Sequence, residues 1–167
     1  VGMFKPHEQI AVVRAARPEA VSIATKELIP DAESEAAAAA LYHWAHEQRI
    51  AVQHIVYAAN EFDHLLDLIG RGIIPGHRHS VIFPLGRYAA DQESDPAELA
   101  PFVAKVRESG GVARFDWWVC AFGESETASL VASAAMGGHG RIGFEDSFIN
   151  ADGTRAESNA ERVGDLR

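Results

Sequence analysis

Five short apolar runs, each followed by a polar loop and a stretch of helical periodicity, constrain the fold of this chain more than any other feature. The runs begin near residues 20, 51, 80, 115 and 140, so each interval is about as long as one βα unit. Strands that alternate with helices predict an α/β fold with a parallel sheet. Because the runs are apolar throughout, both faces of that sheet are predicted to be covered. The predicted strands are 20–25, 51–57, 80–86, 115–122 and 140–144, and the predicted helices are 33–48, 61–69, 94–109, 125–136 and 156–163.

Two architectures accommodate this pattern, a doubly wound open sheet and a (β/α)8 barrel. A complete barrel typically takes about 250 residues and rarely fewer than about 200, whereas this chain has 167. The periodicity alone therefore favours the open sheet. No linker or low-complexity segment divides the chain, so residues 1–167 are predicted to form a single domain.

The composition argues against several classes of function. Lysine and arginine number 15 against 24 aspartate and glutamate, the formal charge is −9, and no basic run appears; nucleic acid and anionic membranes are therefore poor partners. No apolar run approaches the ~20 residues of a membrane span, and the first residues lack the layout of a signal peptide. The single cysteine, Cys120, lies inside an apolar run. It fits a reducing cytoplasm and a buried strand position better than a nucleophile.

In both architectures, functional groups gather at the carboxyl ends of the strands. The densest group follows the fifth run, where the glycine-rich segment 137–140 precedes Arg141, Glu145 and Asp146. Glycine allows close approach of the backbone to a ligand or to another segment. On a strand, residues two apart share a face, so Arg141, Gly143 and Glu145 are predicted to point the same way. Burying the charges of an arginine and a glutamate in one barrel mouth costs free energy unless they pair with each other or take part in a reaction. A structural salt bridge and a reactive site therefore both remain open.

Other candidate sites are weaker. No dinucleotide-binding fingerprint or P-loop is present. His77 and His79 have a spacing that two metal ligands can share, with Glu145 as a third, but they precede the third run and are predicted to be a solvated loop pair. His43 and His46 are predicted to face solvent or to pack.

Segment 137–146, Gly-Gly-His-Gly-Arg-Ile-Gly-Phe-Glu-Asp, followed by Gly153 and by Ala-Glu-Ser-Asn at 156–159, closely resembles the signature of the β-keto acid cleavage enzymes. That family was long known only as a domain of unknown function. The family usually has valine at the position of Gly140 and often asparagine at that of Ser147. Neither difference in this chain adds or removes an ionisable group. Segments 22–30, 83–88 and 118–123 extend the resemblance over most of the chain in the right order.

The resemblance implies a fold and an activity. The fold is a (β/α)8 barrel of the TIM type, of which this chain looks like strands four to eight, with the first three missing. The activity is zinc-dependent cleavage of a β-keto acid with acetyl-CoA, which releases acetoacetate and a new acyl-CoA.

The resemblance also implies site residues. Glu145 matches a zinc ligand, Arg141 and Asp146 match a catalytic pair, and Glu27 matches a substrate-binding carboxylate. The other zinc ligands of the family are a His-x-His pair at the end of an early strand, which this sequence lacks.

Three other interpretations remain. The chain can be an inactive truncated fragment of such an enzyme, another barrel enzyme such as an aldolase, or a non-catalytic binding module. Lys26 is the only lysine near a strand end that suits Schiff-base chemistry. The expected partners are small molecules, a β-keto acid and acetyl-CoA. The acidic surface and the apolar content also permit a homo-oligomer.

Overall fold

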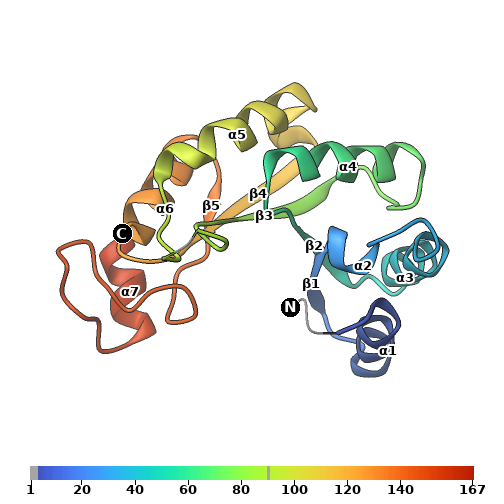
Figure 1. The fold of residues 1–167 in the computed structure, drawn as a ribbon, viewed down its shortest axis with the longest axis horizontal. Helices are drawn as coiled ribbons and strands as arrows, with labels where there is room; N and C mark the ends of the chain where they lie inside the picture. Colours follow the sequence, from blue (N-terminus) through green and yellow to red (C-terminus); the bar gives the residue numbers. More distant parts are fainter. Residues whose placement is uncertain (1–3, 90) are drawn as a thin grey trace. The chain divides into compact units, whose positions relative to one another are not determined.

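A computed structural model describes residues 4–89 and 91–167 and shows an α/β fold with a parallel five-stranded sheet. The strands are β1 (Ala20–Ala24), β2 (Ala51–Ile55), β3 (His79–Leu85), β4 (Phe115–Ala121) and β5 (His139–Gly140). They follow one another in the order β1-β2-β3-β4-β5 (Figure 1). A doubly wound sheet reverses its strand order at a switch point. The sequential order therefore agrees with part of the barrel that the resemblance implies and contradicts the doubly wound arrangement that periodicity favours.

The chain divides into two compact units after Ser80. The helices of the first unit are α1 (Pro6–Ala16), α2 (Thr25–Leu28), α3 (Glu35–Glu47) and α4 (Ala59–Gly70). Helices α3 and α4 confirm the helices predicted at 33–48 and 61–69. These were predictable because each presents an apolar stripe at helical spacing. Helix α1 was not predicted, since Val13 is its only buried residue. Helix α2 occupies a segment that was expected to be a loop, directly after β1.

Two histidines and a tyrosine meet inside the first unit. His54 on β2, His79 on β3 and Tyr42 on α3 are all buried. The ring centroids of His54 and His79 lie 6.2 Å apart, and those of His54 and Tyr42 lie 5.5 Å apart. The prediction of a solvated His77–His79 pair is wrong for His79, because this residue begins β3 and packs in the core, whereas His77 is exposed. His43 and His46 are exposed, as predicted.

Burial of His54 predicts that acid destabilises the protein. Burial, assisted by the nearby His79, lowers the pKa of His54 to about 3, whereas a histidine in the unfolded chain titrates near 6.5. Between these pH values only the unfolded state binds the proton, so the free energy of unfolding falls as the pH falls. We expect a loss of about 2 kcal/mol from this group between pH 7 and pH 5, measured by urea denaturation at both pH values. His54→Phe removes the titrating group, and an equal loss in both proteins would contradict the assignment.

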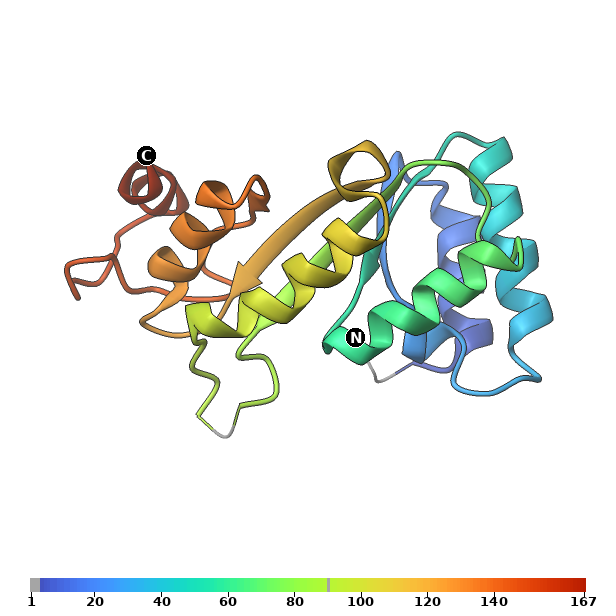
Figure 2. The same ribbon diagram turned by 90° about the horizontal axis from the view of Figure 1, so that it is seen from above.

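The second unit contains η1 (Pro96–Glu98), α5 (Leu99–Glu108), η2 (Gly111–Ala113), α6 (Glu126–Ala135) and α7 (Asn159–Leu166). The helix start predicted at 94–96 is confirmed, because the Asp95 carboxylate accepts a hydrogen bond from Ala97 N at 2.8 Å. Helix α5 runs along β3 (Figure 2). The rings of Phe83 on β3 and Phe102 on α5 stack with their centroids 4.5 Å apart. None of the helices in the described ranges is both long and apolar enough to cross a membrane.

Cys120 lies on β4 and is buried, as predicted for a strand cysteine. Burial, reinforced by the negative charge of Asp146, raises the pKa of the Cys120 thiol to about 12. A thiol needs its thiolate form to act as a nucleophile. Cys120 is therefore a packing residue.

Candidate functional site

The fifth strand ends earlier than predicted. β5 contains only His139 and Gly140, and Arg141 N makes the next sheet-like contact, donating to Val119 O at 2.8 Å. The chain then turns, and Asp146 N and Ser147 N both donate to Gly143 O, at 2.9 and 3.1 Å. The prediction that Arg141, Gly143 and Glu145 share a strand face is therefore wrong, because the strand ends at Gly140 and residues 143–146 form a bend and a turn.

The turn brings Arg141 against Asp146. Arg141 Nη2 lies 3.0 Å from Asp146 Oδ1 and 3.3 Å from Oδ2. The Asp146 side chain is only 1% exposed, while that of Arg141 is 42% exposed. Glu145 Oε2 lies farther away, 3.6 Å from Arg141 Nη2, and the Glu145 side chain is 77% exposed. The site is thus a half-buried ion pair whose arginine reaches solvent.

The surroundings of Asp146 act on its protonation in opposite directions. Burial raises the pKa of the Asp146 carboxyl, and Glu145 adds to this effect. Arg141 opposes it through charge and hydrogen bonding, and Arg87, after β3, opposes it through charge. The net result is a raised pKa. A carboxylate that is desolvated and aimed at a cation is a candidate for proton transfer.

Packing explains a glycine in the segment 137–140 that precedes the site. A β-carbon at Gly138 would lie 2.2 Å from Cζ3 of Trp117, which is closer than nonbonded atoms can come. The close approach expected of this segment is therefore made to the ring of Trp117.

The second unit contains another ion pair, and this one is fully buried. Arg162 Nη2 on α7 lies 2.6 Å from Glu126 Oε2 on α6, and both side chains are 0% exposed. Arg162 Nη1 donates to Asn150 Oδ1 at 3.1 Å and to Asp165 Oδ2 at 3.0 Å. The other oxygen of Glu126 accepts a hydrogen bond from Gly143 N at 3.3 Å. Arg162 was not among the predicted residues, and no local pattern links it to Glu126, 36 positions away.

Glu27 lies on α2 in the first unit. Its Oε2 is buried and has no hydrogen-bond partner among the described residues, so it can accept one from a ligand. The neighbouring Lys26 pairs with Glu61 at 2.9 Å and lies over the ring of Tyr57 at 4.4 Å. These contacts give the lysine a structural role on the surface of the unit.

The described residues do not form a zinc site by themselves. Catalytic zinc takes three protein ligands and keeps one position open, and no group of three His, Cys, Asp or Glu side chains that could hold a metal ion occurs within 4–89 and 91–167. Glu145 is exposed and can supply a single carboxylate ligand.

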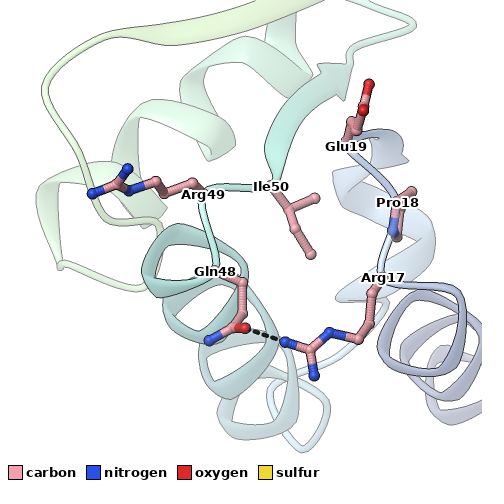
Figure 3. Close-up of a pocket in the computed structure, with 6 residues that line it drawn as sticks. All are labelled: Arg17, Pro18, Glu19, Gln48, Arg49 and Ile50. Atoms are coloured by element: carbon pink, nitrogen blue, oxygen red, sulfur yellow. Dashed lines mark hydrogen bonds between the residues drawn. The ribbon is translucent and has the colours of Figure 1, made fainter.

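A hollow of about 250 Å³ lies at the amino ends of β1 and β2. Arg17 donates a hydrogen bond to Gln48 across one side of it, and the side chain of Ile50 points into it (Figure 3). The remaining lining residues are Pro18, Glu19 and Arg49. In α/β folds of this kind, reactive groups stand at the opposite, carboxyl ends of the strands.

Comparison with known proteins identifies the family. A search of curated proteins gave no significant match. The sequence model of the beta-keto acid cleavage enzymes matches residues 1–167, and therefore includes the Arg141–Asp146 turn. The chain belongs to the β-keto acid cleavage enzyme family.

Proposed function

We propose that this chain supplies a catalytic Arg141–Asp146 pair for the cleavage of a β-keto acid with acetyl-CoA, which yields acetoacetate and a new acyl-CoA. Membership of the family supports a β-keto acid cleavage activity. The observation that carries the proposal is the buried Asp146 carboxylate 3.0 Å from the half-exposed Arg141, inside the signature segment. Glu27, with its buried carboxylate oxygen, is proposed to bind substrate.

The proposed reaction exchanges acyl groups on one carbon. In a β-keto acid, C2 lies between the C1 carboxylate and the C3 ketone. Two bonds break, the C2–C3 bond of the keto acid and the thioester bond between the acetyl group and the sulfur of acetyl-CoA. Two bonds form in their place, one between C2 and the acetyl carbonyl carbon and one between the released acyl group and the CoA sulfur. Nothing is oxidised or reduced, and acetoacetate carries the original C1 and C2.

The two residues have complementary tasks in this exchange. Asp146 accepts the proton that C2 loses when the enolate forms, and returns it to C2 of the product. Arg141 contacts Asp146 through Nη2, so its other guanidinium nitrogens can donate to the oxygen that gains negative charge. Burial of the carboxylate limits its hydration, which strengthens both interactions.

We further propose that Glu145 contributes one ligand to a zinc ion, which as a Lewis acid would polarise the ketone. Glu145→Gln in the full-length protein is expected to weaken zinc binding by about 10-fold or more, because a neutral amide is a poorer ligand than a carboxylate. The measurement is zinc per chain after dialysis against graded chelator concentrations. Glu157→Gln, which changes an exposed carboxylate of the same unit, is the control. Equal zinc retention in wild type and Glu145→Gln would remove Glu145 from the ligand set.

The proposed activity is tested by incubating the full-length protein with a series of β-keto acids and acetyl-CoA. Acetoacetate that appears only with acetyl-CoA supports the proposal. Cleavage without acetyl-CoA, together with borohydride trapping on Lys26, would instead favour an aldolase. A folded protein that converts none of the acids would favour an inactive fragment or a binding module.

A further inference from the structure

Two side chains outside the Arg141–Asp146 pair hold consecutive backbone amides in the middle of the turn. Glu126 Oε1 accepts a hydrogen bond from Gly143 N at 3.3 Å. Asn159 Oδ1 accepts one from Phe144 N at 2.8 Å. The two acceptors come from different helices, α6 and α7.

Glu126 is itself immobilised. Its Oε2 lies 2.6 Å from Arg162 Nη2, and neither side chain is exposed. With both oxygens bound inside the unit, the carboxylate cannot turn away from Gly143 without leaving a buried charge unpaired. Asn159 also fits closely, since a β-carbon at Gly143 would lie 3.0 Å from Asn159 Oδ1.

Gly143 is hydrogen-bonded to the Asp146 side of the turn, whereas Arg141 is held by the sheet. Arg141 N is fixed to Val119 O on β4. On the other side, Gly143 O accepts hydrogen bonds from Asp146 N and Ser147 N. A shift of Gly143 therefore moves Asp146 while Arg141 stays tied to the sheet.

We infer that Glu126 and Asn159 are positioning residues that set the separation of Arg141 and Asp146 by holding the amides of Gly143 and Phe144. Neither residue is assigned contact with substrate. Their effect on turnover rests on the proposed function, whereas their effect on the backbone of the turn does not.

Asn159 gives the first test, made on the full-length protein. Asn159→Ala removes the acceptor of Phe144 N, and Asn159→Asp keeps an oxygen there. We expect Asn159→Ala to speed amide hydrogen exchange in segment 141–147 and to lower kcat on the order of 10-fold with little change in KM. Asn159→Asp should restore both. Thr127→Val is the control, because the Thr127 hydroxyl bonds Arg162 and Asp165 and none of the hydrogen bonds among the described residues joins it to segment 141–147. This variant should leave both kcat and exchange in 141–147 as in wild type.

Glu126 is tested by two double variants that avoid an unpaired buried charge. Glu126→Gln/Arg162→Met keeps an acceptor for Gly143 N, and Glu126→Met/Arg162→Met removes it. Only the second is expected to show faster exchange in 141–147 and a kcat lower on the order of 10-fold. Exchange and kcat equal in the two double variants would overturn the role of Glu126.

The outcomes separate this inference from the proposed function. If the wild type converts no β-keto acid, the proposed function fails and the exchange rates of the same variants decide the positioning role. Faster exchange without a lower kcat in an active enzyme would overturn the inference. A lower kcat without faster exchange would do the same, as would an equal fall of kcat in Thr127→Val.

Discussion

Asp146→Asn is expected to lower kcat by about 100- to 10,000-fold, the range that general-base catalysis contributes, while the fold stays intact. Asparagine has nearly the same shape as aspartate and can still accept a hydrogen bond from Arg141 Nη2, but it cannot take a proton from carbon. The measurement is kcat for acetoacetate formation, with the melting temperature and circular dichroism as checks on folding.

Asp152→Asn is the matched control for this change. Asp152 is exposed and accepts hydrogen bonds from Thr154 in a turn of the same unit, and asparagine can accept the same bonds. We expect unchanged turnover in this control. Unchanged turnover in Asp146→Asn as well would mean that Asp146 is not the base.

Arg162→Met is expected to lower the free energy of unfolding by about 3–5 kcal/mol, because it leaves the Glu126 carboxylate buried without its partner. Asn150 and Asp165 lose a donor at the same time. Urea denaturation followed by tryptophan fluorescence measures the change, since Trp117 and Trp118 report on the second unit.

Arg71→Met provides the contrast. Arg71 pairs with Glu35 and Asp67, but its side chain is 46% exposed, and ion pairs that reach solvent contribute little. We expect this variant to lose far less stability. Glu126→Gln/Arg162→Met should recover part of the loss, because no unpaired charge remains. A loss in Arg162→Met no greater than that in Arg71→Met would contradict a structural role for the buried pair.

The strands were predictable from the sequence because a strand covered on both faces must be apolar along its length. Strands β1 to β4 confirm the predicted bounds within a few residues. The prediction that both faces are covered is wrong for β1 and β2, where Ala20, Ser22 and Ala51 are exposed. The prediction failed at 140–144, where two glycines flank Arg141 and Ile142 and the strand ends at Gly140. Helix α1 was not predicted, because it buries only Val13 and therefore shows no apolar stripe.

The candidate site was only partly predictable. The resemblance singled out Arg141, Glu145 and Asp146. Which carboxylate faces Arg141 depends on the turn at Gly143, because a continuous strand would have placed Glu145 on the face of the arginine in place of Asp146. The link from Glu126 to Arg162 joins two helices 36 positions apart. Such a contact follows from packing, and local periodicity carries no information about it.

An isotope label can follow the carbon atoms through the proposed exchange. The full-length protein is incubated with an unlabelled β-keto acid and acetyl-CoA that carries ¹³C in both acetyl carbons, and the acetoacetate is analysed by NMR. We expect label at C3 and C4 of acetoacetate, none at C1 and C2, and the remaining acyl group bound to CoA. Unlabelled acetoacetate, or release of that group as a free acid with acetyl-CoA unconsumed, would contradict the proposed exchange.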